Sequence, residues 1–415
     1  MDVYSNMNSI KKEKTKVFLG VFFFCFCIFA KMKGSFQIWA AGVIFLLLGV
    51  IAVNDLKISI KINKRQVLTF VAWLVFCISY VLTSNINEAL NGIIQMTMFF
   101  LIIVYGKFIA DTYGELAVEK MFMGICNIIF ITALYGIFEY LTSSNPLKVF
   151  FYVQKELLNN DNSRTMSIYL HPIYFSQVLV IGICINYFFN KSYTKKIIYY
   201  FALIFALYTT KTRGAWLAFG VLLTVVFINW IVRKHRINSM NIFLGLLSIV
   251  GLVILNLKFG IIANIVQRFE ELDGGASFGQ RAEAINYIMD RFNHSSILGK
   301  FIGHGVLGTY HELSKVTFFY QNFVATDNQW VSWIYNNGII FVLFVIAFTI
   351  YAVKIFFETN DNITKFMVII YLVYLGLSFF VEIGSAFAGN LFLFIPIGYL
   401  LNKEIKKEKV NLNGK

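Results

Sequence analysis

Residues 330–357, WVSWIYNNGIIFVLFVIAFTIYAVKIFF, contain a single charged side chain, Lys354. A helix of about 20 mostly apolar residues is long enough to cross a bilayer. The rest of the chain has the same character: of its 415 residues 58% are hydrophobic, 18% aromatic and 14% charged. A soluble domain is roughly 45–50% apolar and roughly 25% charged. The composition therefore indicates an integral membrane protein and excludes a cytosolic enzyme, a secreted toxin and a DNA-binding protein.

The same length criterion predicts an all-α membrane protein of about twelve spanning helices. The predicted spans are Val17–Ala30, Phe36–Val53, Gln66–Ser84, Ala89–Gly106, Val118–Leu141, Met166–Phe189, Ile197–Thr210, Gly214–Val232, Asn241–Leu257, Trp330–Phe357, Phe366–Val381 and Ser385–Leu401. We expect three parts: a membrane domain at residues 1–257 with spans one to nine, an external loop at 258–328, and a second membrane part at 329–415. The last part holds spans ten to twelve and a basic cytoplasmic tail.

The distribution of Lys and Arg predicts the orientation, because cytoplasmic loops carry an excess of both. Placing the N-terminus inside puts 23 of the 36 basic residues on the cytoplasmic side and 7 in short external loops. The other 6 lie in the long external segment, to which the rule gives no weight. Both termini are therefore predicted to be cytoplasmic. The net charge of +14 is then mostly a topology signal, helped by anionic lipid headgroups, and we expect no nucleic-acid partner.

The long external loop is predicted to be ordered, since residues 278–292, FGQRAEAINYIMDRF, form an amphipathic pattern. Ile285, Ile288, Met289 and Phe292 make an apolar stripe at helical spacing. We expect this helix to lie on the membrane surface or to pack against the spans beneath it. After it, the glycines of Gly303-His304-Gly305 predict a tight turn.

Two cations occupy the short external turn Lys211-Thr212-Arg213-Gly214, where short external loops normally avoid them. One interpretation is that both side chains reach toward headgroup phosphates. The other is a pair of donors for a diphosphate, because the planar guanidinium binds phosphate bidentately. Arg164 is expected at the same depth, just before span six. His171-Pro172 is predicted about two turns down that span, where the proline would kink the helix and His171 is either structural or part of a cavity wall.

A carboxylate begins span ten in Asp327-Asn328-Gln329-Trp330. Asp327 is either a helix cap or a general base beside apolar surface. Glu139 and Glu382 are the ionisable residues near span ends that require an explanation. His304 and His311 lie in the long loop without the spacing of metal ligands, so no metal is predicted. The chain also lacks a nucleotide-binding motif, and no cofactor is expected.

Together these segments resemble the O-antigen ligase and polymerase (Wzy-type) superfamily of bacterial envelope polysaccharide assembly. The resemblance runs over about residues 160–345. It rests on Arg164 before a proline-containing span, the Thr212-Arg213-Gly214 turn, the loop helix led by Arg281, the Gly-x-Gly turn, Asp327-Asn328, and Asn337-Gly338-Ile339. Ligases of this family typically carry His where this chain has Asp327, which favours a polymerase.

The resemblance implies a GT-C-like membrane glycosyltransferase on the outer face of the bacterial plasma membrane. Its donor would be an undecaprenyl-diphosphate-linked glycan, polymerised into capsule, exopolysaccharide or O-antigen, with a chain-length regulator and a flippase as possible partners. Arg213 and Arg281 would stabilise the leaving diphosphate and Asp327 would be the base. The predicted substrate-binding residues are Arg164, Lys211, His171, His304, His311 and Asn328.

Three other functions remain open from the sequence. A ligase would move a finished glycan once to a lipid, protein or wall acceptor. A transporter of lipid-linked sugars would use Glu139, Glu382 and His171 in a central pathway, although the two halves lack the matched broken spans of inverted-repeat transporters. A structural scaffold would leave the two cations of the 211–213 turn unexplained.

Overall fold

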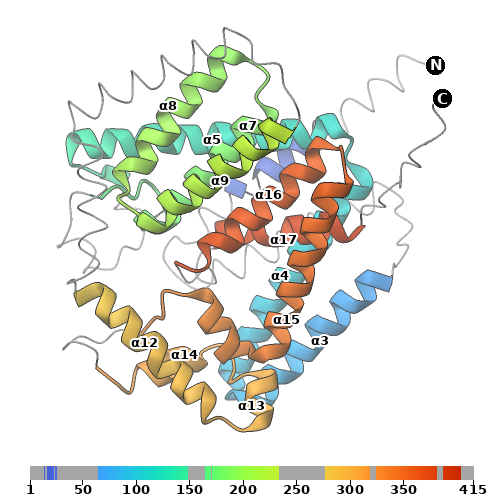
Figure 1. The fold of residues 1–415 in the computed structure, drawn as a ribbon, viewed down its shortest axis with the longest axis vertical. Coiled ribbons are helices and arrows are strands. Elements are labelled where there is room, and N and C mark those ends of the chain that lie inside the picture. The colour runs from blue at the N-terminus through green and yellow to red at the C-terminus, as the bar shows by residue number, and fades with distance from the viewer. Residues whose placement is uncertain are drawn as a thin grey trace.

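A computed structural model describes residues 14, 16–22, 24–25, 64–147, 164–169, 171–232, 276–317, 324–380 and 387–402. These residues form helices and no strand (Figure 1). The helices are α3 (Lys64–Thr83), α4 (Ile86–Thr112), α5 (Glu115–Thr142), α7 (Pro172–Phe189), α8 (Tyr193–Thr209), α9 (Arg213–Val232), α12 (Ala276–Asn293), α13 (Ile297–Ile302), α14 (Gly308–Leu313), α15 (Gln329–Glu358), α16 (Asn362–Leu377) and α17 (Phe387–Asn402). Helices therefore occupy the predicted positions of spans three to eight and ten to twelve.

Four of these helices, α4, α5, α7 and α15, are long and apolar enough to cross a membrane. The predicted spans Phe36–Val53 and Asn241–Leu257 lie outside the described residues. The protein is thus a helical multi-pass membrane protein, and the total of twelve spans stays a prediction.

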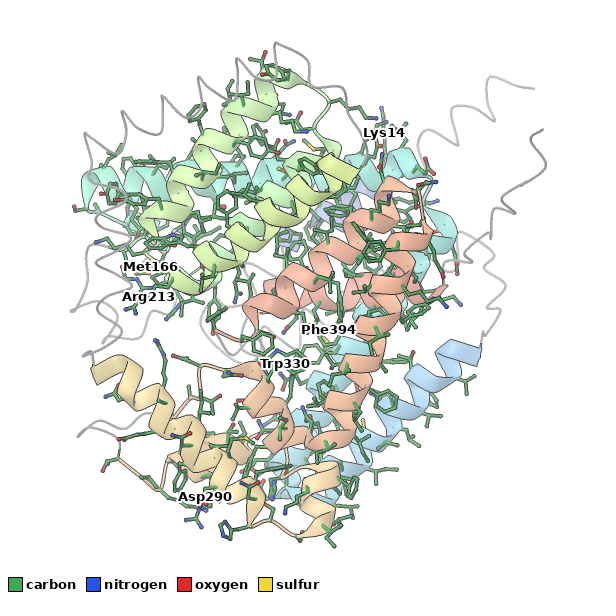
Figure 2. All side chains as sticks on the ribbon, viewed as in Figure 1. Lys14, Met166, Arg213, Asp290, Trp330 and Phe394 are labelled. Atoms are coloured by element: carbon green, nitrogen blue, oxygen red, sulfur yellow. The ribbon has the colours of Figure 1, made fainter. Side chains whose placement is uncertain are left out.

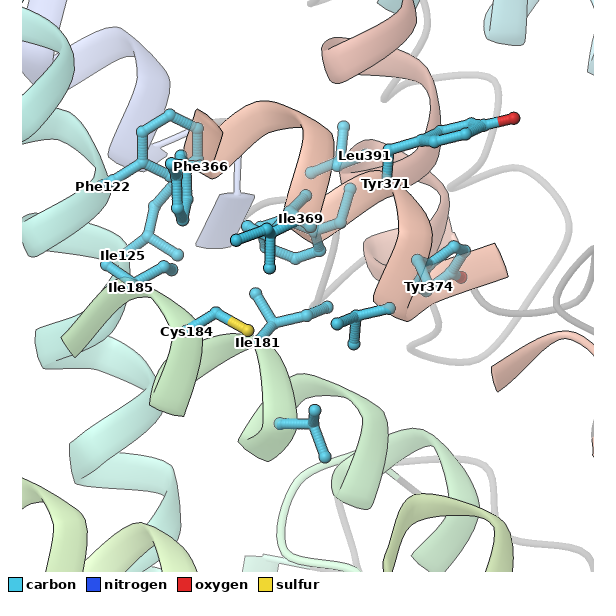
Figure 3. Close-up of a cluster of buried hydrophobic side chains, with 14 of the residues drawn as sticks. Phe122, Ile125, Ile181, Cys184, Ile185, Phe366, Ile369, Tyr371, Tyr374 and Leu391 are labelled. Carbon is cyan, nitrogen blue, oxygen red and sulfur yellow. The ribbon is translucent and has the colours of Figure 1, made fainter. Parts of the chain in front are cut away.

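Helix α7 lies at the centre of the upper helix group in Figure 1, between α5, α8, α9 and α16. Its sequence is apolar on all sides, which is typical of a helix surrounded by other helices. Figure 3 shows Ile181, Cys184 and Ile185 of α7 against side chains of α5 and α16, such as Phe122 and Phe366. This packing fixes the helix ends that carry the polar residues described below.

Helices α4 and α17 cross at two glycines. A Cβ at Gly106 would collide with the carbonyl oxygen of Ile395, and one at Gly398 would collide with that of Ile103. Small residues at helix crossings let backbones approach closely in membranes. Any larger residue at either position would separate the two helices.

Contacts between loops show which helix ends share a face. The N–H of Thr165, before α7, donates to Thr209 O at the end of α8 (3.2 Å), and Gln329 N–H of α15 donates to Ser378 O at the end of α16 (2.9 Å). At the opposite ends, Lys191 pairs with Glu119 (2.6 Å). This alternation agrees with the predicted order of spans, while the side that faces the cytoplasm stays a prediction.

The predicted span Trp330–Phe357 is not one continuous helix, because α15 breaks at Gly338 (φ 76°, ψ 175°). A break leaves backbone carbonyls without helical partners. Here the Gly303-His304-Gly305 turn supplies donors: His304 N–H bonds Tyr335 O (3.0 Å) and Gly305 N–H bonds Asn336 O (3.1 Å). Gly303 and Gly305 have φ of 85° and 90°, as the predicted tight turn requires.

The predicted amphipathic loop helix is confirmed as α12, and it packs against the helices beneath it. Its apolar stripe buries Ala284, Ile288 and Phe292 against Leu313 of α14 and against Val331 and Tyr335 of α15. The first half of α15 and the helices α12, α13 and α14 thus form one packed unit, at the bottom of Figure 1.

Candidate functional site

The turn between α8 and α9 holds the two predicted cations on a defined backbone. Lys211 has φ 50°, a left-handed conformation that costs a non-glycine residue about 1–2 kcal/mol. The N–H of Lys211 donates to Tyr208 O (3.1 Å), and Trp216 Nε1 of α9 donates to Leu207 O (3.2 Å). These hydrogen bonds therefore hold Lys211 in a backbone conformation that glycine would adopt more readily.

Arg164 joins this turn from the neighbouring loop. Its Nε donates to Thr210 O (3.1 Å) and its terminal nitrogen lies 3.4 Å from Thr212 Oγ1. Next to it, the hydroxyls of Thr165 and Thr209 are hydrogen-bonded (2.7 Å). The structure thus places Arg164 against the turn that carries Lys211 and Arg213.

Glu139, near the end of α5, binds the backbone of the loop that contains Arg164. Its Oε2 accepts the backbone N–H groups of Met166 (3.1 Å) and Ser167 (2.7 Å), and its Oε1 accepts from Asn145 Nδ2 (3.0 Å). Only 8% of Glu139 is exposed. These donors therefore supply the hydrogen bonds that an exposed carboxylate would receive from water. This bonding accounts for one of the two unexplained carboxylates; Glu382 lies outside the described residues.

The predicted position of His171 within span six is wrong. Helix α7 begins at Pro172, and His171 is its N-cap, with Nδ1 accepting from Ile173 N–H (3.2 Å). Proline at the first helical position has no N–H to satisfy and is preorganised for the helix. Pro172 therefore starts α7 instead of kinking it, and His171 lies at the helix end.

Asp327 does not cap α15, because Asn328 does so: its Oδ1 accepts from Trp330 N–H (3.0 Å) and Val331 N–H (3.2 Å). Asp327 has φ 48°, and its Oδ2 lies 2.6 Å from Nε of Arg281 on α12. The two side chains are 21% and 42% exposed, so both are partly open to solvent. Because Asn328 caps the helix, the Asp327 carboxylate pairs with Arg281, which is 46 residues away in the sequence. The interpretation of Asp327 as a helix cap is therefore wrong.

Three residues after α16 connect the cationic turn with the Arg281–Asp327 pair. A Cβ on Gly214 would meet the side chain of Phe380, and the ring of Phe379 stacks on Trp330 with 5.0 Å between centroids. Ser378 O accepts the N–H of Gln329. We define Arg164, Lys211, Arg213, Arg281 and Asp327 as the candidate site. Figure 2 shows Arg213 and Met166 at the end of the upper group that lies toward α12, with Trp330 at the start of α15.

The two loop histidines bond elsewhere. His304 stacks on the ring of Tyr335 (4.3 Å between centroids) and its Nδ1 lies 3.1 Å from Tyr335 O. His311 Nε2 lies 2.9 Å from Glu88 Oε1 on α4. Both attach the loop to the helices below it, and neither forms a bond with the candidate site in the described structure.

The described residues contain no group of three or more His, Cys, Asp or Glu placed to hold a metal ion. What the site presents instead is cationic. The site holds four positive side chains and one carboxylate, Asp327, which pairs with Arg281, while Glu139 beside it is buried against backbone donors. Such a face suits an anion with several oxygen atoms.

Sequence reasoning missed the parts of the site that are not charged. The Thr165–Thr209 pair, the Thr210 and Thr212 acceptors and the aromatic contacts of Phe379 and Phe380 came only from the structure. The run Thr209-Thr210-Lys211-Thr212 was the available signal, because hydroxyls gathered at a helix end next to cations favour polar pairing.

A comparison with protein families matches residues 198–346 to a family described as O-antigen ligase. The matched range includes Lys211, Arg213, Arg281 and Asp327, and Arg164 precedes it. No curated protein matches the chain.

Proposed function

We propose that this chain, which carries a domain of the O-antigen ligase family at residues 198–346, polymerises undecaprenyl-diphosphate-linked oligosaccharide repeat units on the outer face of the bacterial plasma membrane. The family supports a membrane glycosyltransferase acting on a lipid-linked glycan. The products we propose are capsule, exopolysaccharide or O-antigen chains. A flippase would supply the repeat units, and a chain-length regulator would limit the polymer.

The observation that carries the proposal is the gathering of Arg164, Lys211 and Arg213 at one turn, joined through residues 378–380 to the Arg281–Asp327 pair. Guanidinium groups bind phosphate oxygens bidentately. Lys211 supports the same interpretation, because within the described residues its ammonium has no hydrogen-bonding or ion-pair partner. The site therefore combines an arginine that is held by hydrogen bonds, Arg164, with the Lys211 ammonium, which can bind a diphosphate.

The proposed reaction follows from where charge develops. A hydroxyl oxygen of one repeat unit forms a bond to the anomeric carbon of the growing chain, and the bond from that carbon to the phosphate oxygen breaks. Undecaprenyl diphosphate leaves with the electron pair, and Arg213 and Arg281 stabilise the negative charge. Asp327 accepts the hydroxyl proton as general base. The donor is already activated, so no nucleotide is required.

The Arg281–Asp327 ion pair suggests which state the site adopts before substrate binds. At 2.6 Å each group neutralises the other. A diphosphate that takes over the Arg281 guanidinium releases the Asp327 carboxylate next to the acceptor hydroxyl. The base would thus become available only when the donor is bound.

A ligase is the second candidate, because the matched family is described by that activity. Asp327 favours the polymerase, since it stands where ligases of the superfamily typically carry histidine. A transporter would use Glu139 and His171 in a central pathway. Both side chains accept hydrogen bonds from backbone N–H groups, which favours a structural role for each and argues against the transporter.

The test is elongation by the purified chain in lipid nanodiscs supplied with the undecaprenyl-diphosphate-linked repeat unit alone. A ladder of products that grows by one repeat unit at a time supports the polymerase. A single transfer that appears only after a separate acceptor is added would replace it with the ligase. If neither product forms from the genuine substrate, the transporter interpretation takes precedence.

A further inference from the structure

The short helix α13 carries three large apolar side chains that are about half exposed or more in the described protein. Ile297 is 77% exposed, Leu298 62% and Phe301 49%. A cluster of exposed large apolar residues on a loop marks a contact with protein or membrane. We name these three residues the apolar edge of α13.

The position of α13 relative to the spans indicates which contact this is. Ser79 Oγ of α3 donates to Ile302 O at the end of α13 (2.6 Å). A Cβ on Gly305 would collide with the side chain of Ser84, so the following turn lies against the end of α3. Helix α13 therefore lies beside the last turns of the apolar helix α3, as the lower part of Figure 1 also shows.

The neighbouring helices expose apolar side chains at the same level. Val81 of α3 is 57% exposed and Leu82 67%, and Ile86 at the start of α4 is 71% exposed. Because α4 is long and apolar enough to span a membrane, these side chains form the lipid-facing surface of the α3–α4 hairpin. The apolar edge of α13 lies at the same end of the hairpin.

The neighbouring helix α14 carries charged side chains. His311 of α14 pairs with Glu88 of α4, and Lys315 pairs with Glu312 (2.7 Å). An apolar helix next to a charged one is typical of a chain segment that lies in a membrane interface.

We propose that α13 inserts Ile297, Leu298 and Phe301 into the acyl-chain region of the leaflet that surrounds the end of the α3–α4 hairpin. Lys300, in the last turn of α13, would reach phosphate headgroups at the boundary. The insertion holds the loop that carries Arg281 at a fixed height on the membrane, whatever reaction the site performs. The proposal is therefore independent of the proposed function.

The test measures membrane depth with a nitroxide label on one accessible cysteine. Cys25, Cys27 and Cys77 are changed to Ala, while Cys126 and Cys184 stay because they are buried. One variant carries Leu298→Cys. The matched control carries His294→Cys at the end of α12, where the native side chain is 77% exposed and polar.

In nanodiscs we expect the Leu298 label to collide several-fold more often with dissolved oxygen, relative to a water-soluble nickel chelate, than the His294 label does. Equal ratios at the two positions would overturn the proposal. Protection of the Leu298 label from both reagents would also overturn it, because a protein surface would then cover α13. If the cysteine variants fail to fold, Leu298→Trp with native cysteines gives a second reading against the wild type, which has six tryptophans: quenching by acyl-brominated lipid beyond that of the wild type supports insertion, and quenching of the six native tryptophans alone contradicts it.

Discussion

Replacement of Asp327 by Asn separates a catalytic carboxylate from a structural ion pair. The amide keeps the size of the side chain, and Asn tolerates the left-handed backbone (φ 48°) as well as Asp does. The change therefore removes the negative charge that lies 2.6 Å from Arg281 Nε and the ability to accept a proton, with little other disturbance.

The two roles predict effects of different size. The paired side chains are 42% and 21% exposed, and partly exposed ion pairs contribute about 1 kcal/mol or less. A loss of about 1 kcal/mol corresponds to about a five-fold change in the folding equilibrium. A general base contributes roughly 10²–10⁴-fold to the rate. We therefore expect elongation by Asp327→Asn to fall by at least about 100-fold while the amount of folded protein changes little.

The assay follows the rate of repeat-unit addition in nanodiscs, at equal amounts of protein that elutes as a single species. Asp290→Asn is the matched control: Asp290 also lies on α12, near His294 (3.4 Å), with a side chain that is 66% exposed. We expect this variant to elongate at the wild-type rate. An Asp327→Asn protein that elongates within about five-fold of the wild-type rate, far short of the roughly 10²-fold loss expected when a general base is removed, would refute the base assignment.

Three further changes test other parts of the structure. Arg213→Ala should abolish elongation at normal protein levels, because it removes charge stabilisation at the leaving diphosphate. The control Arg291→Ala removes an exposed guanidinium on α12 and should leave elongation intact. Unchanged polymer from a stable Arg213→Ala protein would remove Arg213 from the site. Gly338→Ala should destabilise the protein by about 1–3 kcal/mol, because φ is 76° and a Cβ would collide with Phe301 O; an unaltered melting temperature would contradict the broken-helix geometry. Glu139→Gln should cost about 1–3 kcal/mol by leaving a buried donor or acceptor unsatisfied, and a melting temperature equal to that of the wild type would show that the carboxylate does not hold the Arg164 loop.

Much of the helical framework was predictable because a bilayer allows few solutions. Apolar segments of spanning length must be helical to satisfy their own backbone groups, and α3, α4, α5, α8, α9, α15, α16 and α17 lie close to their predicted ranges. The loop helix α12 was predictable for a related reason, since its stripe at helical spacing needs an apolar partner surface.

The errors arose where one local pattern has two solutions. A His-Pro pair fits the middle of a kinked helix or the start of a straight one, and the contacts of the 164–167 segment with Glu139 and Thr209 place it at the start of α7. Asp327 and Asn328 are equally good caps in isolation. Arg281, distant in sequence, binds Asp327 and leaves the cap to Asn328.

Tertiary contacts without a sequence signature also escaped prediction. Residues 330–357 have the composition of one uninterrupted span, yet Gly338 breaks the helix because the glycine turn at 303–305 supplies donors to the freed carbonyls. Nothing local indicated that Phe379 and Phe380 connect the two halves of the candidate site.

The most direct measurement determines chain length and released undecaprenyl diphosphate in the same nucleotide-free reaction. If the protein is a polymerase, each glycosidic bond formed releases one molecule of undecaprenyl diphosphate, and the two quantities rise together as the ladder lengthens. Both should vanish with Arg213→Ala. Release of undecaprenyl diphosphate without chain growth, or growth only when a nucleotide sugar is added, would contradict the account.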